Sequence, residues 1–437
     1  MAEVIPLYPD RPSIAQYVRV GTTGHNQLEA LLESGRLTQD GRLWLDRAVL
    51  GAAAAPRQTS LMRALADRGA ELILDTDVAE LSSPGRFEGA VRQAPWAIGG
   101  QPLQLDDWTG GRGYERIMQI ARFAVEHRFR TVLAPTHLLT GHRDRAFESD
   151  RSVLERLRHA LDDVGGAGVA LDYPLLIPNR ILRDPVERAA FINALRGQPF
   201  DNLWLRIAGF GVDATPVGVR RYISALREFA ELGHPIVADG VAGLAGLATV
   251  AFGAAGGLAH GVGVLERFDT RSWSKRPEKK SKGGAGTRAL VTMLDRQLKV
   301  EEVKAIAAVS GGSRLVSCAD TKCCRRGLTD TLHDPKPHYL YQRRAPIEAL
   351  SRVPESRRAE HYLSQILTPA DRHNRMLNRL KIVDPKLKKI LHESGHRVEQ
   401  LLHVLEDFHI VSASDGRRAS SPKLRKGEPS QSASAQR

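Results

Sequence analysis

The sequence predicts an α/β fold, a (β/α)8 barrel of the TIM type, followed by a C-terminal helical extension. Two observations predict the barrel. Short apolar runs recur along the first 330 residues and end in polar residues, glycine or histidine. Helical patterns separate several of these runs, and an alternation of strands and helices produces a parallel sheet. An open doubly wound sheet is the alternative, but only a barrel brings all the strand ends to one mouth.

Eight apolar runs are the predicted strands, which is the number that closes such a barrel. They cover residues 17–20, 71–74, 131–134, 168–171, 203–205, 235–238, 257–259 and 314–317. Apolar residues at three- and four-residue spacing predict intervening helices over residues 152–164, 186–195, 217–232 and 244–253. The long stretch 79–130, which contains Trp96 and Trp108, is poorly patterned and is expected to form an elaborated loop or lid.

The pattern changes after residue 330. Residues 346–410 carry apolar side chains at helical spacing, and residues 416–437 are basic and poor in large apolar side chains. The predicted organisation is therefore a catalytic barrel over residues 1–330, a helical extension over 331–412 and a disordered basic tail over 413–437.

The composition, with 42% hydrophobic and 26% charged residues, is that of an ordinary globular protein. No apolar run approaches the roughly 18 residues that span a bilayer, and residues 1–12 lack the pattern of a secretion signal. We therefore expect a cytoplasmic protein without a membrane partner. The net charge of +13 suggests an anionic partner. The basic segment 271–288 and the basic tail are either flexible, solvated chain or contacts for nucleic acid, tRNA or DNA. The sequence predicts no oligomeric state.

Reacting groups of a barrel enzyme lie at the carboxyl ends of its strands, and this rule selects the candidate site. Crowded carboxylates separate into an acid and a base, so the predicted catalytic residues are Asp75, Asp172 and Asp239. The predicted substrate-binding residues are Asp77, His137, Tyr173, Arg206, Gly257, His260 and Gly261, and His25 and Asp320 also follow predicted strands. The alternative for each aspartate is a helix N-cap.

Residues 235–263 contain two predicted strands around a short helix of small residues. Their glycines and a helix N-terminus would turn N–H groups toward an anion, so this segment is a candidate phosphate cradle. It resembles the corresponding half of flavin- and phosphate-binding barrels such as the inosine monophosphate dehydrogenase group. The alternative is that small residues only allow close packing of helix and strand.

A second resemblance covers more of the chain. Residues 71–80 (ELILDTDVAE) resemble the strand-Asp-Ser-Gly-Gly element of tRNA-guanine transglycosylases, and residues 168–174 (GVALDYP) resemble their Phe-Asp-Glu-Cys element. Residues 203–211 (LWLRIAGFG) are similar to their strand ending in Gln-Gly-Gly, and residues 256–263 (GGLAHGVG) to their Gly-Gly-Leu-Ala-Val-Gly element. The elements occur in the family's order.

This resemblance implies exchange of a base on a nucleic acid, with Asp75 as general acid or base and Asp172 in base recognition. The sequence departs from the family in that Arg206-Ile-Ala-Gly replaces Gln-Gly-Gly and no Asp-Cys-Val motif supplies the nucleophile. Asp239 and Asp269 are the available substitutes. The basic segment 271–288 would emerge at the same mouth, with Trp273 available to stack on a base.

The three cysteines lie where that family has its zinc site. Cys318-x4-Cys323-Cys324 departs from the family's Cys-x-Cys-x2-Cys, and His338 completes the least strained set of four ligands. The alternative is a group of reduced thiols. The leading hypothesis is thus a transglycosylase-like enzyme. A phosphate- or flavin-binding barrel of small-molecule metabolism and a catalytically inactive nucleic-acid-binding barrel are the two alternatives.

Overall fold

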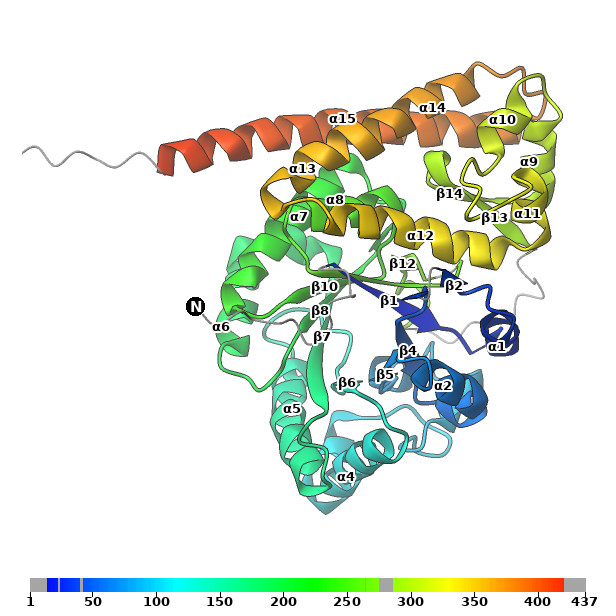
Figure 1. Ribbon diagram of the computed structural model, residues 1–437. Coiled ribbons are helices and arrows are strands. Elements are labelled where there is room, and N and C mark those ends of the chain that lie inside the picture. The colour runs from blue at the N-terminus through cyan, green and yellow to red at the C-terminus, as the bar shows by residue number, and fades with distance from the viewer. Residues whose placement is uncertain (1–13, 23, 40–41, 264, 275–285, 420–437) are drawn as a thin grey trace, which may run out of the picture.

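The structure is a computed structural model that describes residues 14–22, 24–39, 42–263, 265–274 and 286–419 (Figure 1). Eight parallel strands close into a barrel in the order β1-β4-β5-β6-β7-β8-β10-β11, and Ala15 of β1 pairs with Gly257 of β11 at the closure. The strands are β1 (Ala15–Val20), β4 (Arg47–Gly51), β5 (Glu71–Asp75), β6 (Thr131–Leu133), β7 (Ala170–Pro178), β8 (Leu203–Ala208), β10 (Ile236–Asp239) and β11 (Gly257–Gly261). The predicted (β/α)8 barrel is confirmed.

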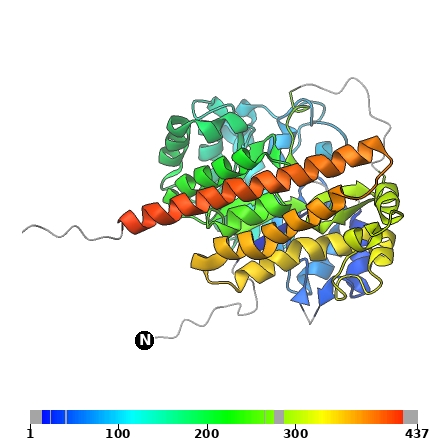
Figure 2. The same cartoon turned by 90° about the horizontal axis from the view of Figure 1, so that it is seen from above.

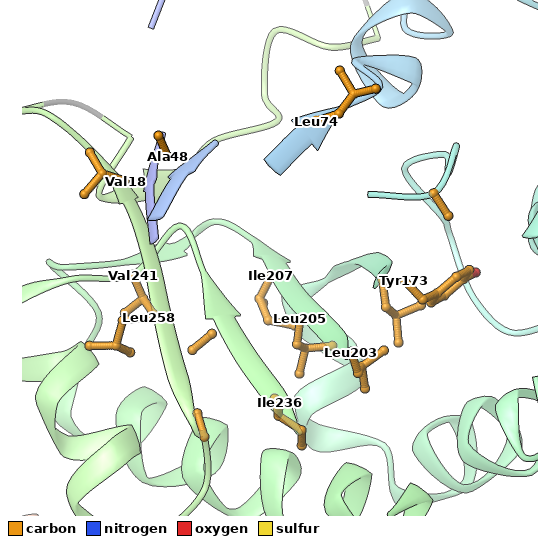
Figure 3. Close-up of a cluster of buried hydrophobic side chains, with 14 of the residues drawn as sticks. Val18, Ala48, Leu74, Tyr173, Leu203, Leu205, Ile207, Ile236, Val241 and Leu258 are labelled. Carbon is orange, nitrogen blue, oxygen red and sulfur yellow. The ribbon is translucent and has the colours of Figure 1, made fainter. Parts of the chain in front are cut away.

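Helices follow the strands and cover the outside of the barrel. They are α1 (His25–Glu33), α2 (Thr59–Ala66), α4 (Gly110–Glu126), α5 (Arg145–Asp163), α6 (Pro185–Leu195), α7 (Pro216–Phe229) and α8 (Gly243–Ala251). Side chains alternate along each strand, so one set faces these helices, as Val18, Leu205 and Leu258 do in Figure 3. The other set fills the barrel interior and includes Tyr17, Val49, Ile73, Leu133, Trp204, Val237 and Ala259.

One predicted strand is wrong and one real strand is missing from the prediction. Residues 314–317 do not form a barrel strand, because Gly312–Val316 is the short helix α10. The missing strand is β4, whose sequence Arg-Ala-Val-Leu-Gly runs directly into four alanines. Apolar runs this short are compatible with either helix or strand, and only the pairing with β1 and β5 decides.

The stretch 79–130 contains no strand, as predicted, but it is more ordered than the predicted loop. It begins within α3 (Val78–Leu81) and ends with the 17-residue helix α4, which buries Ile117 and Ile120. Trp96 and Trp108 are buried at 2% and 0% exposure, so this segment packs on the barrel and is not a loose lid.

The C-terminal region begins with short strands and continues as helices. Strand β12 (Arg267–Phe268) pairs with β9 (Phe210–Gly211), β13 (Arg288–Val291) pairs with β14 (Arg296–Lys299), and a further small hairpin joins β2 (Thr38–Gln39) to β3 (Arg42–Leu43). The helices are α9 (Val300–Ala307), α10, α11 (Leu328–His333), α12 (Pro335–Ser351), α13 (Arg358–His361), a π-helical turn (Tyr362–Leu367), α14 (Thr368–Asn378) and α15 (Pro385–Ala419).

These helices lie directly on the barrel. Helix α12 occupies the place of the eighth barrel helix, because Tyr339 donates a hydrogen bond to the carbonyl of Gly261 (3.0 Å) and the Ile14 amide donates to Ser351 (3.2 Å). Figure 2 shows α12 in yellow, α14 in orange and α15 in red side by side across this face. Of the predicted disordered tail, residues 413–437, residues 413–419 belong to α15, and residues 420–437 lie outside the described residues. None of the described helices has the length and apolar character needed to cross a lipid bilayer.

Candidate functional site

Six charged side chains meet at the carboxyl ends of the barrel strands, and we call them the mouth cluster. They are Arg19 of β1, Asp75 of β5, Asp77 and Glu80 around α3, Arg206 of β8 and Asp239 of β10. Side-chain alternation explains the position of four of them, because Arg19, Asp75, Arg206 and Asp239 each lie two residues beyond a residue of the apolar interior layer. The interior layer therefore forms the floor of the cluster.

Arg19 links two of the carboxylates. Its Nε and Nη2 donate to the two oxygens of Asp239 at 2.9 and 2.5 Å, and its Nη1 donates to Asp75 at 2.5 Å. Arg206 lies 3.8 Å from Asp239 and 3.7 Å from Glu80, and its guanidinium stacks over the Phe268 ring at 4.3 Å. The side chain of Asp239 is 1% exposed and that of Asp75 is 17% exposed, so Asp75 is the carboxylate that is more open to solvent.

The pKa values of Asp75 and Asp77 are shifted in opposite directions. Burial alone would raise the pKa of Asp75, but the Arg19 and Arg206 guanidiniums outweigh it and lower this pKa below its usual value. Burial, together with the negative charges of Asp75 and Glu80, raises the pKa of Asp77 well above its usual value. Two neighbouring carboxyl groups whose pKa values separate in this way are suited to act as a base and an acid.

The backbone around Asp77 is shaped for this arrangement. Asp77 has a left-handed φ of 56°, its amide donates to Asp75 (3.0 Å), and its carboxyl accepts a hydrogen bond from the Ala53 amide (3.0 Å). Gly51 at the end of β4 leaves room for the carboxyl, since a Cβ there would lie 2.7 Å from an Asp77 oxygen. A non-glycine residue in this conformation is uncommon and costs free energy, which is typical of a functional position.

Asp172 and Tyr173 do not lie at a strand end, and this part of the prediction is wrong. Strand β7 continues to Pro178, so both residues lie in its first half. Asp172 points into the barrel and accepts hydrogen bonds from Trp204 Nε1 (2.7 Å) and Asn202 Nδ2 (2.8 Å), near the start of β8. Tyr173 packs in the outer cluster between strands and helices. Asp75 and Asp172 therefore have separate partners in different layers of the barrel.

Two further predicted residues are also away from the mouth. His260 faces outward from β11 and contacts Gln16 Nε2 (3.0 Å) and the Tyr339 hydroxyl (3.2 Å) of α12. Gly257 begins β11 at the amino end, while Gly261 ends that strand and pairs in register with Arg19. Only Gly261 of these three reaches the mouth.

The predicted phosphate cradle already holds an internal anion. The Leu244 amide at the start of α8 donates to the Asp295 carboxylate (3.0 Å), and a Cβ on Gly243 would lie 2.1 Å from the same carboxylate. Arg343 and Arg397 also pair with Asp295, at 2.8 and 3.4 Å. The small residues of this segment thus allow an aspartate from the C-terminal region to cap the helix.

His137 forms a dyad with Asp150, a residue of α5 that the sequence did not single out. The two oxygens of Asp150 accept from His137 Nδ1 (2.6 Å) and from its backbone amide (3.0 Å). His137 Nε2 is buried and has no hydrogen-bond partner among the described residues. Burial acts to lower the pKa of His137, but the Asp150 charge outweighs it and the pKa is raised.

The three cysteines and His338 come together as predicted. Their sulfur and nitrogen ligand atoms all lie within 4.8 Å of one another. The Cys323 and Cys324 sulfurs are 3.7 Å apart, and each is 3.4 Å from His338 Nδ1. A tetrahedral zinc ion would need about 3.8 Å between sulfurs and about 3.6 Å between sulfur and nitrogen, so the group fits this ion.

The surroundings of this group also suit a metal. His338 Nε2 donates to the Leu290 carbonyl (2.9 Å), which leaves Nδ1 with its lone pair toward the sulfurs. Gln342 Nε2 donates to the Cys318 sulfur at 3.4 Å. Zinc here would join the segment around Cys318 to α12 and would not take part in the mouth cluster.

Two more predicted positions, Asp269 and Trp273, lie in the segment after β12. Asp269 pairs with Arg271 in an exposed loop after β12, where hydrogen bonds from Arg271 lower its pKa to about 2. Trp273 is 5% exposed and packs edge-to-face on Phe268 at 5.1 Å between ring centroids. Most of the basic segment 271–288 lies outside the described residues.

The sequence analysis missed Arg19 and Glu80. Arg19 is a lone charge within the apolar run of β1, and this isolation was the available signal. Because Tyr17 and Arg19 are two residues apart, they face the same side of the strand, which is the barrel interior. Glu80 gave no signal, since a glutamate in a short helix is most often solvated.

Comparisons with known proteins identify no family for this chain. No protein-family model and no curated protein matches the chain. Among solved structures, the endo-1,4-beta-xylanase XylE of Penicillium canescens is 11% identical, with a TM-score of 0.38, over 56% of this chain and 81% of that chain. The thiamine phosphate pyrophosphorylase of Pyrococcus furiosus is 12% identical, with a TM-score of 0.30, over 60% of this chain and 93% of that chain. Likenesses at this level carry no argument about activity.

Proposed function

We propose that the chain is a barrel enzyme that acts on a nucleic-acid base or nucleoside at the mouth cluster. The observation that supports this is the contact between Asp75 and Asp77, whose pKa values are shifted in opposite directions. A nucleobase edge presents N–H donors next to carbonyl or ring-nitrogen acceptors. An ionised carboxylate can accept a hydrogen bond from an N–H donor, and a protonated carboxyl can donate one to a carbonyl or ring-nitrogen acceptor. The same pair is suited to remove a proton from one ring atom and to supply one to another.

Each member of the cluster has a distinct role in this proposal. Asp75 is the general base, because it is ionised and is the more solvent-accessible of the two strand-end carboxylates. Asp77 is the proton donor. Asp239 is a positioning residue, since its side chain is only 1% exposed and both of its oxygens accept hydrogen bonds from Arg19. Arg206 lies beside Glu80 and Phe268 and is available to bind a carbonyl oxygen or a developing negative charge.

Transglycosylase-like base exchange is the reaction class that we propose to test first. The resemblance of residues 71–80 to the transglycosylase element supports it, together with the position of Asp75 at the end of β5. The structure changes the assignment of base recognition, because Asp172 is engaged with Trp204 and Asn202. We assign that role to Asp77 instead. The Cys3His group is proposed to hold one structural zinc ion.

The test is incorporation of labelled guanine or a 7-deazaguanine into tRNA or DNA by the purified full-length protein. Asp75→Asn should lower the rate by about a hundredfold or more, because it removes the base while keeping the shape. Asp213→Asn is the matched control, since this aspartate is exposed and pairs with Arg267. An unchanged rate in Asp75→Asn would refute the assignment of the base. Salt-dependent nucleic-acid binding without turnover would favour the inactive barrel, and a flavin spectrum would favour a cofactor enzyme.

A further inference from the structure

Five exposed cations gather where α14 ends and α15 begins, and we call them the basic tip. They belong to the segment 379–389 (RLKIVDPKLKK) and are Arg379, Lys381, Lys386, Lys388 and Lys389. Within the described residues, Lys389 alone of the five has an ion-pair partner, Glu393 at 3.8 Å. Arginine and lysine side chains are charged at neutral pH, so the basic tip carries positive charge that the described chain does not neutralise.

The stability of α15 does not explain these charges. The N-terminus of a helix carries a partial positive charge, which favours acidic side chains in the first turn and disfavours lysines. The first turn of α15 contains no acidic residue. Asp384, the single acid of the segment, precedes the helix, and its carboxylate accepts from the amides of Lys386 (2.8 Å) and Leu387 (3.5 Å). The lysines therefore oppose the helix that carries them, as expected of cations that serve an anionic partner.

The basic tip stands on a packed support. The ends of α14 and α15 share an apolar core with α9 and α10, whose buried members include Leu377, Leu387, Leu391, Val303 and Val316. Figure 1 shows the turn between α14 and α15 beside α10. Because this core fixes the ends of both helices, the backbone that carries the cations has a defined position.

Helix α15 leads from the basic tip to the rim of the barrel mouth. Arg397 Nη1 donates to the carbonyl of Val212 (2.6 Å), in the loop after β9, on the same side of the barrel as the carboxyl end of β8. The stretch from Lys389 to Arg397 is about two turns of helix, or roughly 12 Å. About four nucleotides of one strand cover this length. A nucleic acid that lies across the rim can therefore reach the basic tip within a few nucleotides.

The composition of the basic tip favours a phosphate backbone over a lipid surface. Surfaces that bind anionic membranes place large apolar or aromatic side chains beside their cations. Residues 379–389 contain no aromatic residue, and Val383 is their one exposed large apolar side chain. Contacts to phosphates require only cations and do not depend on the base sequence.

We propose that the basic tip binds the phosphate backbone of the nucleic acid whose base is presented to the mouth cluster. The identity of this partner as the substrate rests on the proposed function. The basic tip then holds the substrate across the rim of the mouth, and the mouth cluster selects the base.

Fluorescence anisotropy with the full-length protein at several salt concentrations tests this. The probes are a labelled DNA duplex, labelled tRNA, and labelled vesicles of phosphatidylcholine and phosphatidylserine. The tip variant is Lys381→Gln/Lys386→Gln/Lys388→Gln. Its slope of log affinity against log salt concentration for nucleic acid should be smaller in magnitude by about 2 to 3, because each phosphate contact contributes about 0.7 to 0.9.

The control variant, Arg63→Gln/Arg122→Gln/Arg196→Gln, loses the same net charge elsewhere. These three arginines are exposed and lie on α2, on α4 and directly after α6, which Figure 1 shows far from the turn between α14 and α15. The control should keep the wild-type slope. The tip variant should melt at or above the wild-type temperature, since its lysines oppose the helix dipole, and this checks that it is folded.

The outcomes separate the basic tip from the proposed function. A smaller slope in the tip variant, with wild-type slopes in the control variant and in Asp75→Asn, supports the basic tip even where no base exchange is detected. Equal slopes in the tip and control variants would overturn the basic tip, and base exchange by the wild type would then leave the proposed function standing. Wild-type protein that binds the vesicles but neither nucleic acid, or that binds none of the probes, would also overturn it.

Discussion

At the scale of single residues, Asp172 shows how a buried carboxyl couples stability to pH. It lies inside the barrel, where burial raises its pKa to about 7 although Trp204 and Asn202 donate hydrogen bonds to it. In the unfolded chain the same group has a pKa near 3.8. The folded state therefore binds this proton more tightly than the unfolded state does.

We predict that this proton makes the wild-type protein less stable as the pH rises. The stabilising contribution of Asp172 is complete below pH 3.8 and is lost as the pH rises through about 7. Relative to Asp172→Asn, which cannot titrate, the free energy of unfolding of the wild type should fall by up to about 4 kcal/mol between pH 4 and pH 8. Urea denaturation at several pH values measures this, and parallel pH profiles for the two proteins would contradict it.

Part of the mouth cluster could be predicted from the sequence. Asp75, Asp77, Arg206 and Asp239 were expected at one mouth because each belongs to or follows a predicted strand. Asp172 was misplaced because the predicted strand ended at residue 171, before this polar residue, whereas β7 continues to Pro178. Arg19 was missed because the strand-end rule selects residues after an apolar run and not charges within one. The raised pKa of Asp77 depends first on its burial, which the local sequence does not reveal.

At the scale of elements, the start of α8 depends on one glycine. Gly243 has a φ of +63° and allows the Asp295 carboxylate to reach the Leu244 amide. We predict that Gly243→Ala lowers the free energy of unfolding by about 1–3 kcal/mol or more. The left-handed backbone conformation disfavours a side chain, and a Cβ at this position would clash with the Asp295 carboxylate. Gly256→Ala is the matched control, since a Cβ there would have its nearest neighbour at 3.9 Å. Equal melting temperatures for the two variants would show that the Asp295 carboxylate can move away from residue 243 without loss of stability.

Strand β4 and helix α10 are the two elements that the sequence pattern failed to predict. Both are apolar runs of about four residues beside small residues, and the sequence pattern cannot distinguish helix from strand at this length. Long helices were easier, because α6 and α7 show several turns of periodic apolar residues. The eighth helix position could not be predicted, since α12 reaches it only after the β13–β14 hairpin and three shorter helices.

At the scale of the whole molecule, the Cys3His group ties the C-terminal region together. We predict one zinc ion per chain by elemental analysis, and a melting temperature that falls on chelation because the metal binds only the folded arrangement. Cys323→Ser should lose the metal and melt earlier. His333→Gln should retain the metal and the wild-type melting temperature, since His333 is exposed and lies outside the ligand group. If the purified protein contains no metal and its melting temperature does not change when a chelator is added, the three cysteines are reduced thiols and not zinc ligands.

The pairing of β1 with β11 has a consequence for synthesis on the ribosome. The first strand of the barrel is translated about 240 residues before its last partner, and at 5–20 residues per second this delay is roughly 10 to 50 seconds. During that time the nascent β1 presents one unpaired row of backbone N–H and C=O groups. The chain therefore closes its barrel late, and we expect chaperones that shield strand edges to raise its yield.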